Sequence, residues 1–335
     1  MKRTVSIYAT LLILFSFYAY ACSASRRSDS PKSQTSYAMG SLVTQTVYGG
    51  DGQTLENAMK AIVALDDEIS YRNDMSVIAE LNENANARLS AKALELITQS
   101  QKLSRETDGK YDITVLSLVL LWGFDTDSPS LPDDNDIRSA LLKTGYEKIT
   151  INDDIVTLAG GAAVDLSAAG KGEACEVAVN EYKKAGITGG IVTVGGSVGV
   201  YGTKNGEKFT VGVRDPFDAS SLLGTLLLTD IYISTSGSYE KKFSSGGTEY
   251  HHLLDTDTGY PVENGLISVT VICNDGGLSD MLASAFFCVG KEKALTLIGE
   301  YSAEAIFVTT DKHIYITGGL ADCFDSSYGF TVISP

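Results

Sequence analysis

The stretch VDLSAAGKGEACEVAVNEYKKAGITGGIVTVGGSVGVYG, residues 164–202, decides the fold class. Its first residues predict the end of a strand, followed by a turn of small residues. The residues after this turn predict a helix that ends at Gly186. Val- and Ile-rich segments then flank the glycine pair 195–196, a pattern that predicts two strands around a tight turn. Further strands are expected over 208–216 and 222–237. Because strands mostly follow strands, the sequence favours an α+β fold over a doubly wound parallel sheet.

The remaining periodic segments add helices to this sheet. Apolar residues recur at helical spacing over 54–70, and a second helix is predicted over 91–105 with Ser90 as its N-cap. A third is predicted over 279–289, ended by Gly290, and residues 41–49 alternate as a half-buried strand does. No Pro- or Ser-rich linker divides residues 37–335, so we expect one compact domain there.

The composition excludes several classes of protein. Of 335 residues, 44% are hydrophobic and 20% are charged, which is a globular composition. There are 26 Lys and Arg against 42 Asp and Glu, for a formal net charge of −16. Partners such as nucleic acid require many basic side chains that displace counterions, so we expect no nucleic-acid partner.

The first residues predict an export signal over 1–21. Lys2 and Arg3 are followed by an uncharged apolar segment, and Ala19-Tyr20-Ala21 fits a small-x-small cleavage site. Cys22 follows directly, as in a bacterial lipoprotein, where it is acylated. Residues 22–36 then predict a lipidated cysteine and a flexible tether to a membrane. The alternatives are a buried apolar helix, an uncleaved anchor, or a secreted protein cut at the same bond.

Few residues are available for catalysis or metal binding. The common dinucleotide, P-loop, zinc-protease and serine-hydrolase motifs are absent, and only three histidines occur. A metal would therefore be a hard cation bound by oxygens. Asp280 and Ser284 lie four residues apart on a predicted helix and could bind Mg²⁺ together. The alternative is that Asp280 only stabilises the helix dipole.

Three other segments could contact a ligand. Residues 250–262 combine two histidines, two aspartates and a Gly-Tyr-Pro turn, and predict either a catalytic loop or an Asx-stabilised turn. Asp165 and Lys171 flank small residues, which suit either a phosphate site or a close contact between a strand and a helix. Tyr111 could stack on an aromatic ring or face the core. The four cysteines after Cys22 lack C-x-x-C spacing, so burial or a disulfide stays open.

In their joint order these segments resemble the ApbE family, the FAD:protein FMN transferases. VDLSAAGKG resembles the family's Asp-Leu-x-x-x-Ala/Gly-Lys-Gly turn, and YHHLLDTDTGYPV its His-Ile-x-Asp-Pro-x-Thr-Gly segment. The resemblance extends over essentially all of residues 37–335. Its other motifs are AMGS (38–41), ISYRNDMSVIAELN (69–82), TDGKYDITVLSLVLLWGF (107–124), VTVGGSV (192–198), STSGSYEKKF (234–243) and SDMLASAFFCVG (279–290).

The resemblance implies a T-fold-like α+β architecture, with mostly antiparallel mixed sheets, flanking helices and an FAD crevice between two lobes. It implies that Mg²⁺ binds the FAD pyrophosphate, which is split so that FMN passes to a Thr or Ser hydroxyl and AMP leaves. The implied acceptor is an exported flavoprotein such as a redox-pump subunit. The implied location is a bacterial membrane, facing the periplasm or the cell exterior.

Site residues follow from the same resemblance. His252 is the expected base, with Asp255 as its support. The metal ligands implied are Asp280, Ser284 and the backbone carbonyl of Ala168. FAD is expected to contact Met39, Tyr71, Lys110, Tyr111, Asp112, Asp165, Lys171 and Leu254.

The chain also departs from the family pattern. Thr256 stands where the family has proline, which predicts a looser turn, and Asp257 stands where it often has arginine, which reverses a charge near the phosphates. Two other functions therefore stay open beside FMN transfer. One is a Mg²⁺-dependent FAD pyrophosphatase that yields FMN and AMP, and the other is an FAD-binding lipoprotein without catalysis.

Overall fold

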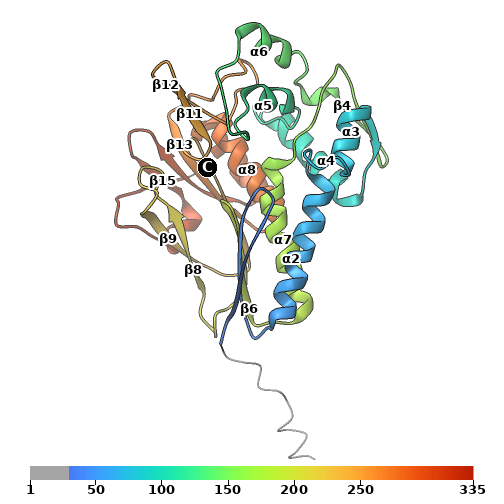
Figure 1. Ribbon diagram of the computed structural model, residues 1–335. Coiled ribbons are helices and arrows are strands. Elements are labelled where there is room, and N and C mark those ends of the chain that lie inside the picture. The colour runs from blue at the N-terminus through green and yellow to red at the C-terminus, as the bar shows by residue number, and fades with distance from the viewer. Residues whose placement is uncertain (1–29, 335) are drawn as a thin grey trace, which may run out of the picture.

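The computed structural model describes residues 30–334 (Figure 1). The predicted signal, Cys22 and the tether up to residue 29 lie outside the described residues and stay predictions. Within residues 30–334, no helix combines the length and apolarity needed to cross a membrane.

A nine-stranded sheet forms the centre of the fold, in the order β1-β2-β6-β7-β10-β13-β14-β15-β17. Its neighbouring strands are antiparallel except β15 and β17, which are parallel. The fold is therefore α+β with a mixed, mostly antiparallel sheet, as the sequence predicts. The strands are β1 (Lys32–Ala38), β2 (Ser41–Tyr48), β6 (Gly189–Val194), β7 (Ser197–Gly202), β10 (Ile231–Gly237), β13 (Leu266–Cys273), β14 (Glu304–Thr309), β15 (Ile314–Thr317) and β17 (Thr331–Ile333).

Three helices cover one face of this sheet: α2 (Gly52–Ile69), α7 (Ser167–Ala185) and α8 (Gly276–Val289) (Figure 1). Successive side chains of a strand point to opposite faces. Val192 and Val194 of β6 are accordingly buried in the main core against these helices, whereas Ile191 packs on the other side.

The opposite face is covered by a three-stranded sheet of β8 (Phe209–Arg214), β9 (Leu222–Leu228) and β16 (Phe324–Asp325). Val211, Val213 and Leu226 of this sheet form a second apolar cluster with Val200 and Ile233 of the large sheet. The large sheet is thus buried on both faces over much of its area.

The other elements surround this framework. A third apolar cluster joins α5 and α6 around Trp122, near the β11–β12 hairpin at the top of Figure 1. The helices and strands outside the layers described above are α3 (Val77–Asn84), α4 (Ala91–Glu106), α5 (Leu116–Trp122), α6 (Asp134–Leu141), α9 (Lys291–Ile298), β3 (Asn86–Arg88), β4 (Ile149–Asn152), β5 (Ile155–Leu158), β11 (Lys242–Ser245) and β12 (Thr248–His251).

The expected helix boundaries are largely confirmed. Ser90 caps α4 by accepting a hydrogen bond from the Ala93 amide, and α7 ends at Gly186 in the left-handed conformation. Helix α8 begins at Gly276 rather than at Ser279, because Asp275 caps it by accepting from the Leu278 amide.

The tether prediction is wrong for its last residues. Lys32–Ser36 belong to β1, which pairs with β2 from Lys32 opposite Val47 to Ala38 opposite Ser41. This strand lies at the edge of the sheet and is held by main-chain hydrogen bonds, so it needs no apolar cluster in its sequence. The described domain therefore includes residues before position 37.

Two glycines let α7 and α8 approach closely. A Cβ on Gly172 would lie 2.0 Å from the Gly276 carbonyl oxygen, and a Cβ on Gly276 would lie 2.4 Å from the Gly172 carbonyl oxygen. Only glycine fits at such a contact. The close contact is thus between two helices rather than between a strand and a helix. Gly170 and Lys171 of the same segment border the cavity described next, and phosphate binding there stays a prediction.

The four described cysteines, Cys175, Cys273, Cys288 and Cys323, are free thiols. Cys175 and Cys273 are buried in the main core. Within residues 30–334, burial as small apolar side chains is therefore the alternative that holds.

Candidate functional site

A cavity of about 1430 Å³ lies where the two halves of the chain meet. Its walls come from residues 37–171 and from residues 193–288. Of the thirteen site residues predicted within residues 30–334, eleven line it: Met39, Tyr71, Lys110, Tyr111, Asp112, Asp165, Ala168, Lys171, His252, Leu254 and Ser284. The fold therefore gathers segments that are far apart in the sequence. Asp280 and Asp255 do not line the cavity.

Met39 occupies the turn between β1 and β2 at the cavity wall. Its φ of 54° is unusual for a residue with a side chain, and its amide donates a 2.7 Å hydrogen bond to Asp66 Oδ2 that holds this conformation. The Met39 side chain packs against Gly170 of α7, where a Cβ would come within 2.8 Å of Met39 Cε. The AMGS motif is thus a rigid turn fitted to the start of α7.

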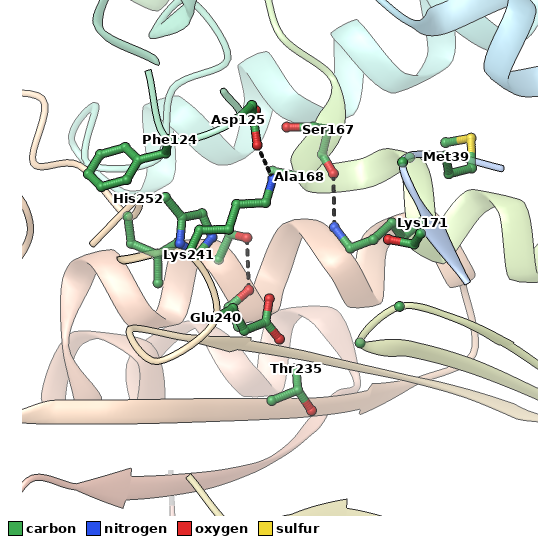
Figure 2. Close-up of a pocket in the computed structure, with 18 of the residues that line it drawn as sticks. Met39, Phe124, Asp125, Ser167, Ala168, Lys171, Thr235, Glu240, Lys241 and His252 are labelled. Atoms are coloured by element: carbon green, nitrogen blue, oxygen red, sulfur yellow. Dashed lines mark hydrogen bonds and ion pairs between the residues drawn. The ribbon is translucent and has the colours of Figure 1, made fainter. Parts of the chain in front are cut away.

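Asp280 lies behind the cavity wall, 2% exposed, against the first turns of α7. Its Oδ2 accepts hydrogen bonds from the amides of Lys171 and Gly172, each at 3.1 Å. Lys171 Nζ lies 3.8 Å from the same oxygen and also donates to the Ser167 carbonyl oxygen at 3.3 Å (Figure 2). The Asp280 carboxylate raises the pKa of Lys171, so this cation is retained at neutral pH.

The predicted metal ligands differ in their access to the cavity. Ser284 lies one helical turn after Asp280 and borders the cavity, where its hydroxyl is 3.0 Å from that of Ser236. Ala168 borders it from α7. No group of three or more His, Cys, Asp or Glu side chains placed to bind a metal occurs within residues 30–334. A carboxylate, a hydroxyl and a carbonyl nevertheless form an oxygen donor set whose chemistry fits Mg²⁺.

Sequence reasoning missed a charged cluster at the cavity. Asp125 binds both Arg72 and Lys241, and all three residues line the cavity. Figure 2 shows the pair of Asp125 with Lys241. Although burial acts in the opposite direction, the hydrogen bond from Lys241 lowers the pKa of Asp125. Arg72 and Lys241 stand within motifs quoted above, directly after Tyr71 and Glu240. Nothing in the local sequence shows that they meet, because Asp125 belongs to a third segment.

His252 is placed in the cavity wall, as predicted, but its titration differs from the expectation for a base. Burial of the ring lowers the pKa of His252 to about 3, and the charges of Lys241 and Lys171 act in the same direction. Its Nδ1 has no hydrogen-bond partner among residues 30–334. The imidazole is therefore neutral at physiological pH.

The expected support of His252 by Asp255 is wrong. Asp255 Oδ1 instead accepts from Lys110 Nζ at 2.8 Å and from the Asp257 amide at 2.9 Å. The carboxylate whose charge raises the pKa of His252 is that of Asp125. Asp255 does not support His252 because it is the first residue of the turn 255–259, and its side chain closes that turn.

The two departures in this turn are compensated. Thr256, expected to loosen the turn, donates from its hydroxyl to the Gly109 carbonyl oxygen at 2.8 Å. Asp257 Oδ2 is 2.8 Å from Lys110 Nζ, so the reversed charge has a cationic partner. The turn is thereby fastened to the segment 107–124 rather than loosened.

Tyr111 and Asp112 line the cavity but are mainly buried. Tyr111 is 4% exposed and its hydroxyl is 3.3 Å from that of Ser100, so it serves the core as well. Asp112 Oδ1 accepts from the Thr114 amide and hydroxyl at 2.8 and 2.7 Å. Burial raises the pKa of Asp112 and that of Asp165.

The low pKa of His252 predicts a measurable loss of stability in acid. Between an ordinary pKa of 6.5 and about 3, the unfolded chain binds more protons at this residue than the folded chain. The stabilisation is thus complete above pH 6.5 and decreases as the pH falls. We expect the unfolding free energy of His252→Gln to fall by about 2 kcal/mol less than that of the unsubstituted protein between pH 7 and pH 5, measured by urea denaturation. Equal losses in the two proteins would contradict the buried neutral state.

Comparisons with known proteins show the family of this chain. The sequence model of the ApbE family matches residues 39–307. An FAD:protein FMN transferase of Klebsiella pneumoniae (strain 342) is 27% identical over 293 residues, covering 85% of this chain and 91% of the relative. The crystal structure of the ApbE protein from Thermotoga maritima aligns with a TM-score of 0.77 and 28% identity, covering 85% of this chain and 96% of that one. The apo form of the flavinyl transferase ApbE from Pseudomonas stutzeri aligns with a TM-score of 0.78 and 25% identity, covering 90% and 98%. The chain therefore belongs to the ApbE family, whose named members are transferases.

Proposed function

We propose that this protein transfers FMN from FAD to a Thr or Ser hydroxyl of an acceptor protein and releases AMP. The observation that carries the proposal is the cavity, which collects eleven of the thirteen residues singled out by the resemblance. Its volume of about 1430 Å³ accommodates a dinucleotide. The names of the relatives support the same activity.

The cations of the cavity suit the pyrophosphate of FAD. Lys171 lies near the N-terminus of α7, where the helix dipole also favours an anion. Lys241 and Arg72 are held from the other side by Asp125. Aromatic and apolar side chains of the wall, among them Tyr71, Phe124 and Leu254, suit the flavin and adenine rings.

Mg²⁺ would be held by Asp280, Ser284 and the Ala168 carbonyl. When bound, it supplies a charge that neutralises the phosphate oxygens. The protein's own contribution is Lys171, whose ammonium group lies near the same carboxylate and can hydrogen-bond a phosphate oxygen.

We assign His252 the role of accepting the proton of the acceptor hydroxyl. Its neutral imidazole lines the cavity, and an unprotonated ring nitrogen can accept this hydrogen bond. Burial of the ring and, to a smaller extent, the charges of Lys241 and Lys171 lower the pKa of His252 in the unliganded protein. Binding of a pyrophosphate to these two cations would offset their charge and raise the pKa of His252 toward the value a base needs.

We further propose that the protein is exported and attached through a lipid on Cys22, so that its acceptor is an exported flavoprotein such as a redox-pump subunit. The sequence of residues 1–22 supports this proposal. The chain after residue 21 has 24 basic and 42 acidic residues. We therefore propose that a lipid tether, and not a basic surface, attaches the protein to the membrane.

The distribution of flavin among products tests the proposal. We expect that incubation with FAD, Mg²⁺ and a candidate exported flavoprotein yields acceptor-bound FMN and AMP in equal amounts, measured by gel fluorescence and by chromatography. A matched acceptor with its Ser and Thr residues near the flavin site changed to Ala should remain unlabelled. Free FMN released at the same rate with and without acceptor would indicate a pyrophosphatase, and intact FAD would indicate a binding protein without catalysis.

A further inference from the structure

The lining of the cavity falls into two groups of elements. All the residues that the resemblance assigns to FAD, to the metal or to the base come from residues 39–171 and 252–284. A second group comes from β6, β7, β8, β10 and the loop after β8, and none of it has an assigned role; it includes Thr193, Val198, Arg214, Phe217, Ala219 and Thr235. We call this group the strand-side wall. The cavity of about 1430 Å³ exceeds the roughly 300–1,000 Å³ of common small-molecule sites, which leaves room beside FAD.

The strand-side wall contains a cation whose side chain is not engaged in a direct ion pair with a described residue. Six Lys and Arg residues line the cavity, and five form ion pairs with carboxylates: Arg72, Lys110, Lys171, Lys241 and Lys242. The side chain of Arg214 forms no ion pair or hydrogen bond among residues 30–334, and the main chain of this residue pairs with Leu222 of β9. It is exposed at the end of β8, and its charge acts on Tyr239 and Glu240 nearby. An arginine presented in this way suits a carboxylate of an incoming molecule.

Large apolar side chains are exposed at the same cavity. Phe217 of the strand-side wall is 40% exposed, and Tyr37 at the end of β1 is 71% exposed. Leu42, 60% exposed, pairs directly with Tyr37 across the β1–β2 hairpin, so the two side chains share a face. Exposed aromatic and aliphatic side chains beside an arginine are typical of the anchor positions of protein–protein interfaces.

We propose that the strand-side wall binds a segment of the acceptor protein, with Arg214 pairing an acidic side chain of that segment and Phe217 and Tyr37 packing an apolar one. This inference rests on the proposed function and adds the site of acceptor recognition. Gly195 and Gly196, in the turn between β6 and β7, connect this wall to the phosphate side. A Cβ on Gly195 would lie 3.2 Å from Lys171 Cδ, and one on Gly196 would lie 3.3 Å from Glu240 Oε1. An acceptor hydroxyl bound along this wall therefore lies next to the expected position of the pyrophosphate.

Arg214→Ala and Phe217→Ala test the inference, measured with the acceptor that the unsubstituted protein labels in the assay above. Each should raise the KM for the acceptor about tenfold, with kcat and the dissociation constant for FAD unchanged. Lys208→Ala and Leu227→Ala are matched controls. Lys208 directly precedes β8 and Leu227 lies in β9, and both are exposed but do not line the cavity. They should leave the KM unchanged.

A double-mutant cycle identifies the acidic partner. Acidic residues flanking the labelled position of the acceptor are changed one at a time to Asn or Gln. One of these acceptor substitutions should raise the KM with the unsubstituted enzyme but have little further effect with Arg214→Ala. The reason is that the acceptor substitution and Arg214→Ala each remove the same ion pair. Additive losses at every position, a normal KM in Arg214→Ala, or weakened FAD binding in that variant would overturn the inference. Failure of the unsubstituted protein to label any acceptor would reject the proposed function, and this inference with it.

Discussion

Asp280→Asn is expected to lower the rate of FMN transfer at least a hundredfold. Asp280 Oδ2 accepts from the amides of Lys171 and Gly172 and lies 3.8 Å from Lys171 Nζ. Asparagine keeps the size of the side chain but removes the charge that raises the pKa of Lys171 and that a hard cation requires. Losses of this size follow when one preorganised electrostatic group is removed. The measurement is single-turnover transfer at saturating FAD and acceptor.

Glu173→Gln is the matched control for Asp280→Asn. Glu173 is also a buried acid, 3% exposed, on α7, but it pairs with Lys92 and does not line the cavity. We expect Glu173→Gln to retain transfer, with any effect limited to thermal stability. Equal activity losses in both variants would mean that removal of any buried charge between α7 and α8 is sufficient, and would contradict a specific role of Asp280.

Gly172→Ala is expected to lower the free energy of unfolding by about 3 kcal/mol. The new Cβ would lie 2.0 Å from the Gly276 carbonyl oxygen, which is a backbone atom and cannot rotate away. Helices α7 and α8 would have to separate, and the main core beneath them would open. The same separation withdraws Asp280 from the α7 amides, so transfer should fall together with stability. Urea denaturation measures the first effect.

Gly52→Ala provides the control for glycine replacement within a helix. Gly52 begins α2, and a Cβ there would have no heavy atom within 4 Å. This variant should be unchanged or slightly more stable, because alanine restricts the unfolded chain. If Gly172→Ala unfolds at the same urea concentration as Gly52→Ala, the close contact between the helices does not have the importance assigned to it.

Elements with a strong local pattern were predictable from the sequence. The capping by Ser90, the end of α7 at Gly186 and the paired glycines between β6 and β7 follow from side chains a few residues apart. The α+β class follows from the same patterns. Strand β1 was not predictable from the sequence. It is an edge strand held by main-chain pairing with β2, and the polar residues of its sequence are also typical of a flexible tether.

The site was predictable as a set of residues, but the pairings within it were not. The resemblance identified eleven of the cavity residues. It did not show that Asp255 binds Lys110, or that Asp125 joins Arg72 and Lys241. Each pairing connects residues separated by more than fifty positions, so local patterns contain no information about it. The low pKa of His252 likewise depends on burial and on two distant lysines.

Mass spectrometry of a candidate acceptor after reaction with FAD and Mg²⁺ tests the central claim most directly. Transfer of FMN through its phosphate predicts one acceptor peptide that gains the mass of FMN less water, on a single Thr or Ser residue. The same experiment with Asp280→Asn should show almost none of this product. An acceptor of unchanged mass, in a reaction that has nevertheless consumed FAD and produced free FMN and AMP, would contradict the account.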